Sequence, residues 1–238
     1  NALKTITMNR LCIIPARGGS KRIPRKNIRE FAGKPINAFS IEAALNCELF
    51  DEVMISTDDD EIAQIAESYG ASVPFRRNRK AANDTATLLA VIEDVLLNYK
   101  NKGQQPKEIC CLLATAPFVT IEMLRKAYKL FQIEKYDSVF PIVKFDNPIQ
   151  RSLKFEGKKL QMNWPNNIHL RSQDLEDCYY DSGLFYWLNQ QPLIKKKLWT
   201  DNSSAIVLNS LVTQDIDTES DWKLAELKYN YLKNEQRI

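Results

Sequence analysis

Short apolar runs rich in β-branched residues alternate along this chain with segments whose apolar residues recur at helical spacing. Runs of four to six such residues are typical of strands buried in a parallel sheet. The strand-like runs are 11–14, 53–56, 109–113, 139–143, 184–188 and 205–208, and the helical segments include 62–69, 88–99 and 124–131. Such alternation predicts a three-layer α/β fold around a mainly parallel sheet.

The strand–helix rhythm is interrupted after residue 148. Residues 149–182 mix many charged residues with turn-forming ones, which indicates an irregular or hairpin excursion. The chain shows no internal repeat and no linker rich in glycine or serine. We therefore predict a single domain over 1–238, with 140–182 as a small inserted element.

Composition excludes several classes of protein. The 238 residues, 44% hydrophobic and 26% charged, are enough for a full core and unlike a disordered or collagen-like chain. The longest nearly unbroken apolar run, 109–119, is shorter than the about 20 residues that cross a bilayer, so we expect no membrane partner. Five cysteines without a Cys-x-x-Cys pair argue against a disulfide framework or a zinc site. With no apolar secretory stretch at its start, the chain is predicted to be cytoplasmic.

Positive charge is concentrated at the start of the sequence. The whole chain carries a net charge of +3, but residues 1–40 alone carry +8 and the remainder carries −5. A basic segment this short indicates a local anion site. A nucleic-acid-binding face would spread such charge over more of the molecule.

The basic residues surround a glycine pair directly after the first predicted strand. Ligands of open α/β sheets bind at the carboxyl ends of strands, and Gly18 and Gly19 would let backbone amides approach an anion closely. Arg17, Lys21 and Arg25 could add charge-assisted hydrogen bonds to phosphate oxygens. The segment matches neither the Walker A loop nor Gly-x-Gly-x-x-Gly. It predicts a phosphate cradle, and the alternative is a solvated basic loop.

Two carboxylates, Asp215 and Asp217, lie two positions apart near the end of the chain. On a strand this spacing places them on one face, so we expect them side by side at a strand end. Like charges this close are unfavourable unless a cation joins them, and carboxylates together with substrate phosphates commonly hold Mg²⁺. The alternative, equal on spacing alone, is that Asp217 caps the following helix and Asp215 is merely exposed. Thr218 and Asp221 have the spacing of a capping box at that helix.

A third polar cluster lies between residues 171 and 186. Arg171, Gln173 and nearby acidic and aromatic side chains could grip a carboxylated ligand or form a subunit interface, and composition does not separate the two. His169 is the only histidine, and no Gly-x-Ser-x-Gly accompanies it. We therefore expect His169 to be structural and predict no nucleophilic triad.

Five segments in order along the chain resemble the acylneuraminate cytidylyltransferases, which make CMP-sialic acids from CTP. The first is Ile-Pro-Ala-Arg-Gly-Gly-Ser-Lys-Arg-Ile-Pro-Arg-Lys-Asn at 14–27, continued by Phe-Ala-Gly-Lys-Pro-Ile at 31–36. The others are Ser-Thr-Asp-Asp at 56–59, Asn-Asp-Thr-Ala-Thr at 83–87, Ala-Thr-Ala-Pro-Phe at 114–118 and Gln-Asp-Ile-Asp-Thr at 214–218. The resemblance covers nearly the whole chain. It implies the Rossmann-like fold of nucleotide-diphospho-sugar transferases, with 140–182 as a dimerisation element.

Within this family the chain most resembles the pseudaminate branch. The matching stretches are 140–143, 148–151, 171–175 and 185–187. Sialate enzymes usually carry a glutamine and an arginine where this chain has Leu113 and Val119, and Asn-Gly where it has Ser182 and Gly183. These departures point away from N-acetylneuraminate and toward pseudaminic acid as the acceptor.

The resemblance implies a role for each group of matched residues. The residues that would bind CTP phosphates and ribose are Ala16, Arg17, Gly18, Ser20, Lys21 and Asn27. Those that would contact cytosine are Arg76, Asp84 and Thr85, with Arg77 or Asn83 able to replace their neighbours. Those that would line the sugar side are Arg171, Gln173 and Tyr179. Asp215 and Asp217 would bind Mg²⁺ and, with Arg17 and Lys21, would be catalytic.

The predicted partners are CTP, a nine-carbon 2-keto acid sugar and a second copy of the chain in a homodimer, with Mg²⁺ as cofactor and without nucleic acid. Legionaminate, N-acetylneuraminate and KDO are alternative acceptors. In a different class, the basic loop would make this a non-catalytic polyanion- or RNA-binding protein. That reading predicts salt-sensitive binding with no Mg²⁺ requirement and gives the Asp215–Asp217 pair no purpose.

Overall fold

The computed structural model describes residues 8–78 and 86–235, and its centre is one seven-stranded sheet. The strands are β1 (Arg10–Pro15), β4 (Glu52–Ser56), β5 (Glu108–Leu112), β6 (Ser138–Lys144), β9 (Tyr179–Asp181), β10 (Phe185–Leu188) and β11 (Ser203–Leu208). Their order is β11-β6-β10-β5-β1-β4, with β9 paired to β6. The pairs β1–β4, β1–β5 and β6–β11 are parallel, whereas β9 and β10 run antiparallel to their neighbours. The predicted strands are all confirmed.

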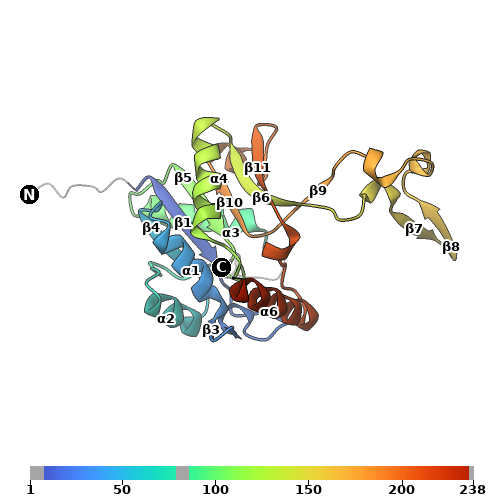
Figure 1. The fold of residues 1–238 in the computed structure, drawn as a ribbon. Helices are drawn as coiled ribbons and strands as arrows, with labels where there is room; N and C mark the ends of the chain where they lie inside the picture. Colours follow the sequence, from blue (N-terminus) through green and yellow to red (C-terminus); the bar gives the residue numbers. More distant parts are fainter. Residues whose placement is uncertain (1–7, 79–85, 236–238) are drawn as a thin grey trace, which may run out of the picture.

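Helices cover both faces of the sheet, which confirms the three-layer prediction (Figure 1). The helices on one face are α1 (Ile36–Asn46), α2 (Asp60–Ser68) and α4 (Ile121–Ile133); those on the other are α3 (Leu88–Asn101) and the short α5 (Gln190–Ile194). Side chains of a strand alternate between faces. Accordingly Cys12 and Ile14 of β1 pack in the first cluster, and Leu11 and Ile13 pack in the second.

A third apolar cluster joins the start of the chain to its end. It packs α6 (Glu219–Asn234) against α1 and the small hairpin of β2 (Glu30–Phe31) and β3 (Lys34–Pro35). Phe31 lies at its centre, edge-on to Phe39, Trp222 and Tyr229 at centroid distances of 5.7, 5.6 and 5.4 Å. This packing fixes the segment that precedes α6 beside the basic residues that precede β2.

An extended arm, residues 145–178, leaves the sheet after β6 and returns at β9 (Figure 1). It consists of the hairpin β7 (Leu153–Glu156) and β8 (Lys159–Met162), with 3-10 turns at Ile149–Arg151, Pro165–Asn167 and Ser172–Asp174. No residue of the arm is buried. Of the predicted element 140–182, β6 and β9 therefore belong to the central sheet, and only the residues between them project.

The structure shows the state of the cysteines and the character of the helices. All five cysteines are free thiols, and Cys12, Cys47, Cys110 and Cys111 are buried. Burial raises the pKa of Cys47 to about 11, so this thiol is protonated and unreactive at neutral pH. In the part of the chain that the structure describes, no helix has both the length and the apolar character needed to cross a bilayer.

Candidate active site

A cavity of about 500 Å³ opens where the strands β1 and β5 end. Its wall is built from the loop after β1 (residues 16–27, here the basic loop), the start of α3, the loop after β5 and Asp217. The lining residues outside the basic loop are Pro15, Arg77, Ala86, Leu88, Val91, Leu113, Ala114, Thr115 and Asp217. Segments some 190 positions apart in the sequence thus share one cavity at the edge of the sheet where ligands of this class of fold bind.

Two side chains hold the backbone of the basic loop, one from outside it and one from its own last residue. The amide of Gly18 donates to Asp58 Oδ1 at 3.0 Å, and the side chain of Asn27 donates to the Arg17 carbonyl at 2.8 Å. A Cβ atom at Gly18 would lie 2.5 Å from Asp59 Oδ2, so any larger residue here would have to displace the Asp59 side chain. Asn27 is itself buried and acts here on the loop's own backbone.

Arg25 supports the loop from outside the cavity. It adopts a left-handed conformation with φ of 55° and donates to both carboxylate oxygens of Asp59 at 2.5 and 2.9 Å, and to Glu61 at 2.5 Å. The hydrogen bond from Arg25 lowers the pKa of Asp59 to about 2. Arg25, expected among the phosphate ligands, therefore braces the loop against the start of α2 and is absent from the cavity wall.

The other basic side chains of the loop converge on the cavity. Arg17, Lys21, Arg22 and Lys26 all line it, together with Ser20. Four cations around one opening favour a ligand with several negative charges, such as a triphosphate, because each can form charge-assisted hydrogen bonds to its oxygens. The structure thus places Arg17, Ser20 and Lys21 where the sequence predicted an anion, with Ala16 and Gly18 forming the adjacent backbone.

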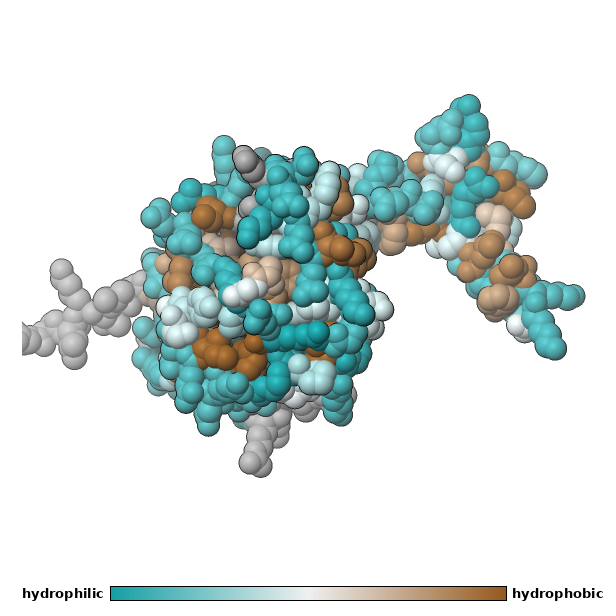
Figure 2. All heavy atoms as spheres, turned by 60° about the horizontal axis from the view of Figure 1, so that its bottom comes forward, coloured by the Kyte–Doolittle hydropathy of each residue, from teal (hydrophilic) through white to brown (hydrophobic). Residues whose placement is uncertain are grey.

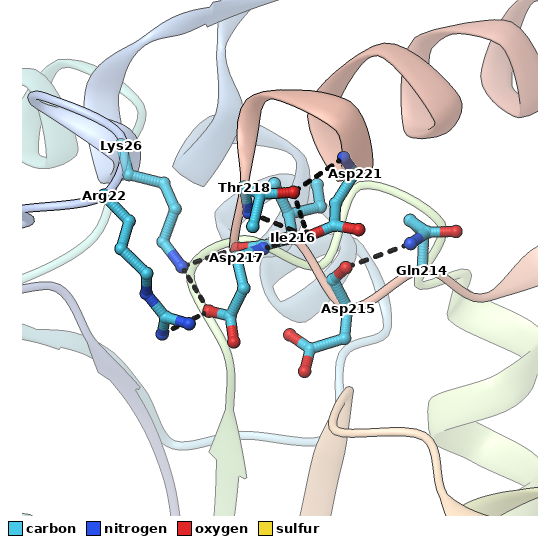
Figure 3. Close-up of polar contacts among 8 residues, drawn as sticks. All are labelled: Arg22, Lys26, Gln214, Asp215, Ile216, Asp217, Thr218 and Asp221. Carbon is cyan, nitrogen blue, oxygen red and sulfur yellow. Dashed lines mark hydrogen bonds and ion pairs between the residues drawn. The ribbon is translucent and has the colours of Figure 1, made fainter. Parts of the chain in front are cut away.

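Asp217, from a segment near the other end of the chain, faces two of these cations, Arg22 and Lys26 (Figure 3). Its carboxylate accepts from Arg22 at 2.8 Å and lies 3.5 Å from Lys26 Nζ, which also donates to the Ile216 carbonyl at 2.6 Å. Asp217 is not the helix cap, because Thr218 is the N-cap of α6 and forms the predicted capping box with Asp221. The expectation of a strand end was wrong: residues 213–217 belong to no strand or helix and follow a 3-10 turn at Ser210–Val212.

The carboxylate of Asp215 lies beside that of Asp217 (Figure 3). Desolvation and the neighbouring charge of Asp217 raise the pKa of Asp215. Among the described residues the Asp215 carboxylate has no hydrogen-bond partner, and no cluster of three or more metal-binding side chains occurs there. Two adjacent carboxylates, one of them unpartnered, fit a hard divalent cation that completes its shell with phosphate oxygens and water.

The neighbouring arginines Arg76 and Arg77 have different positions. Arg76, expected near cytosine, lies on the surface with its guanidinium paired to Asp60 at 2.9 Å and does not line the cavity. Arg77 is buried and lines it, donating to Ser56 Oγ at 2.9 Å, and desolvation lowers its pKa to about 10. Asp84 and Thr85 lie outside the described residues.

The three residues expected on the sugar side lie away from this cavity. Arg171 pairs with Asp174 at 2.7 Å within the arm, and Gln173 lines a smaller hollow of about 350 Å³ at the base of the arm. Tyr179 begins β9 and is exposed. Within one copy of the chain, these side chains and the cavity of the basic loop form separate sites.

Sequence reasoning gave no binding role to several of the cavity residues, among them Arg22, Lys26, Leu113 and Thr115. Arg22 and Lys26 belong to the recognised basic motif, but nothing in their spacing distinguishes them from Arg25. Leu113 and Thr115 come from the weaker motif after β5. The one signal that could have selected Leu113 and Thr115 is that they directly follow the end of a buried strand.

The chain is similar along most of its length to proteins that form CMP-sugars. A pseudaminic acid cytidylyltransferase from Campylobacter jejuni (serotype O:2, strain NCTC 11168) is 40% identical over 93% of this chain and 97% of its own. A CMP-N,N'-diacetyllegionaminic acid synthase from Legionella pneumophila (strain Philadelphia 1) is 32% identical over 92% of this chain and 95% of its own.

Solved structures and a family model agree with these relatives. The structure of a CMP-2-keto-3-deoxy-manno-octonic acid synthetase complexed with CTP superimposes with a TM-score of 0.68, covering 95% of this chain and 99% of that one at 15% identity, which supports the fold. The family model described as cytidylyltransferase matches residues 11–226. That span includes the basic loop and both aspartates, and the chain belongs to the cytidylyltransferase family.

Proposed function

We propose that this protein transfers CMP from CTP to the anomeric hydroxyl of pseudaminic acid, giving the CMP-sugar and pyrophosphate. The observation that carries the proposal is the shared cavity of the basic loop and Asp217, in a chain 40% identical to a pseudaminic acid cytidylyltransferase. The anomeric oxygen forms a bond to the α-phosphorus while the bond from that phosphorus to the bridging oxygen breaks. The hydroxyl proton is released and pyrophosphate leaves.

The basic loop supplies the positive charge that this reaction needs. Phosphoryl-type transfer depends mainly on positioning and on neutralising charge, so it proceeds without a histidine. In the proposal Arg17 and Lys21 contact the phosphates and stabilise the charge that grows on departing pyrophosphate. Ser20 and backbone amides beside Gly18 add hydrogen bonds, and Arg77 forms part of the same wall.

The two aspartates are the proposed Mg²⁺ ligands. When bound, the ion would neutralise charge on the phosphates and polarise the α-phosphate. Support comes from the raised pKa of Asp215 and from its unpartnered carboxylate beside Asp217, within the described residues. Arg22 and Lys26 hold Asp217 at the cavity edge.

The arm is the proposed dimer contact, and through it the sugar side of the site. One face of its hairpin carries Leu153, Phe155 and Leu160, which are 57%, 75% and 60% exposed. Apolar side chains gathered this way without a core call for a partner surface. In a homodimer the arm would bring Arg171 and Gln173 toward a second copy.

The proposed location of the protein is the cytoplasm, because five free thiols suit a reducing compartment.

The test is pyrophosphate release by the purified protein with CTP, Mg²⁺ and pseudaminic acid. We expect turnover with pseudaminic acid to exceed that with legionaminate, N-acetylneuraminate and KDO, assayed side by side. Omitting Mg²⁺ or replacing CTP by ATP should abolish it. No release with any of the four acids would overturn the proposal, and binding of any polyanion without a metal requirement would favour a non-catalytic protein.

A further inference from the structure

The segment that carries the two aspartates is contacted by a lysine that the catalytic proposal does not use. Lys228 lies on α6, more than two turns beyond its start. Its Nζ donates to the carbonyl oxygens of Ser210 and Thr213 at 2.9 and 2.8 Å, and to Gln214 Oε1 at 3.0 Å. An ammonium group has three donors, and all three are used on the chain just before Asp215.

The contacts continue from Lys228 to Asp215 through one side chain. Gln214 accepts from Lys228 with its oxygen and donates from its nitrogen to the Asp215 carbonyl at 3.0 Å. The other end of the segment is held from the same helix, where Asp221 accepts from the Asp217 amide at 3.1 Å. Helix α6 thus fixes the backbone on both sides of the carboxylate pair.

The environment of Lys228 indicates a role beyond surface charge. The side chain is partly buried, and desolvation lowers its pKa. None of its three hydrogen-bond partners is a carboxylate. The charge of Asp146 opposes this pKa shift, but within the described residues Asp146 forms no ion pair with Lys228. Removing an ammonium from water without a directly paired acid costs free energy, so an apolar residue here would be the simpler solution for packing alone. What the ammonium adds is a rigid connection between α6 and the backbone of residues 210–214.

We propose that Lys228 is a positioning residue, whose ammonium holds the segment before Asp215 so that the Asp215 and Asp217 carboxylates stay side by side as a preformed cation site. The catalytic part of this inference rests on the proposed function. The structural part, a segment held by Lys228, does not.

The test compares Lys228→Met with a matched control, Lys223→Met. Lys223 is exposed on the same helix and has no hydrogen bond or ion pair in the described residues, so both variants lose one charge from α6. Hydrogen–deuterium exchange of the free protein reports on the segment without any substrate. We expect amides of residues 213–217 to exchange roughly tenfold faster or more in Lys228→Met, because three hydrogen bonds are lost, and unchanged exchange in the control.

A second readout follows the cation site itself. Mn²⁺ binding in the presence of CTP, measured by electron paramagnetic resonance, should weaken roughly tenfold in Lys228→Met while CTP binding without metal stays within about twofold. Lys228→Arg, which keeps the charge and the donors, should recover part of the Mn²⁺ affinity. If Lys228→Met does not fold, the same two measurements are made on Lys228→Arg.

The outcomes separate the two proposals. Wild-type exchange of residues 213–217 and wild-type Mn²⁺ affinity in a folded Lys228 variant would overturn the positioning role. Absence of pyrophosphate release by the unaltered protein would overturn the proposed function and leave the exchange result to decide about Lys228.

Discussion

The body of this molecule, which is the central sheet with the helices that cover it, buries its apolar side chains, whereas the arm exposes them. In the body, strand β1 is buried from Leu11 to Ile14 because helices cover both faces of the sheet. In the arm no residue is buried, and its apolar side chains stand out against the polar surface (Figure 2). A cavity built on the body is preorganised by a core, whereas the arm has no buried residue to support it.

The hairpin of the arm is amphipathic, with one apolar face and one polar face. The register pairs Phe155 with Leu160 and Leu153 with Met162, so these four side chains share one face. The other face carries Lys154 paired with Gln161, and Glu156 paired with Lys159. A lone two-stranded hairpin is marginally stable in water. Covering its apolar face with another protein surface would therefore stabilise it.

The largest expected effect belongs to the body. Asp217→Asn removes one of two adjacent carboxylates and should lower the rate of pyrophosphate release by at least about a hundredfold, since the site loses half of the negative charge that would hold a cation. The melting temperature and the molar mass should stay at the wild-type values. Asp201→Asn, an exposed acid in a turn before β11, is the matched control. A near-normal rate for Asp217→Asn would mean that the acidic pair has another purpose.

A smaller loss is expected at the basic loop. Lys21→Ala should remove about 2–3 kcal/mol of transition-state stabilisation, a fall of roughly 30- to 160-fold in kcat/KM, as loss of one preorganised charge contact does. Steady-state kinetics would show most of this in kcat. Lys129→Ala, on the exposed side of α4, should leave both constants unchanged. If only KM rises, Lys21 binds CTP without favouring the transition state.

The arm should respond in assembly and hardly at all in stability. Phe155→Ser places a hydroxyl on the apolar face of the hairpin. If the arm is the dimer contact, the molar mass measured by light scattering should fall from that of a dimer to that of a monomer. The melting temperature of the body should change little, because the side chain is 75% exposed in one copy. Lys154→Ser, on the opposite face of the hairpin, should leave the molar mass unchanged. A wild-type protein that is already monomeric would show that the apolar face is not a dimer contact.

Much of the body could be predicted from the sequence because its signals are local. Buried runs and helical periods give the strands and helices, and the spacing of Thr218 and Asp221 gives the start of α6. The antiparallel direction of β10 could not be predicted, since an apolar run such as 184–188 contains no information on direction. The same holds for the pairing of β9 with β6, which depends on how the arm returns.

The site was predictable where it follows from strand ends and charge. The roles that the family resemblance implies require the basic loop and Asp217 to lie together, and both line the same cavity. The choice between Arg76 and Arg77 was not predictable, because adjacent arginines carry the same signal. A contact distant in sequence separates them, since the Arg77 amide donates to the Thr57 carbonyl at 2.8 Å. Arg171 and Gln173 lie in the arm, away from the cavity, and a local sequence pattern contains no information on what the arm contacts.

The route by which the chain enters and leaves the arm has a consequence for how such proteins diversify. Lys144 and Tyr179 are neighbours in the β6–β9 pairing, so the two ends of the arm are held about one strand spacing apart. In topological terms the arm is the loop of a hairpin, and loops are where insertions and deletions are tolerated. It could be shortened, lengthened or exchanged for another without altering the neighbours of any strand. A lineage could therefore change the surface that the arm presents while inheriting the cavity of the basic loop intact.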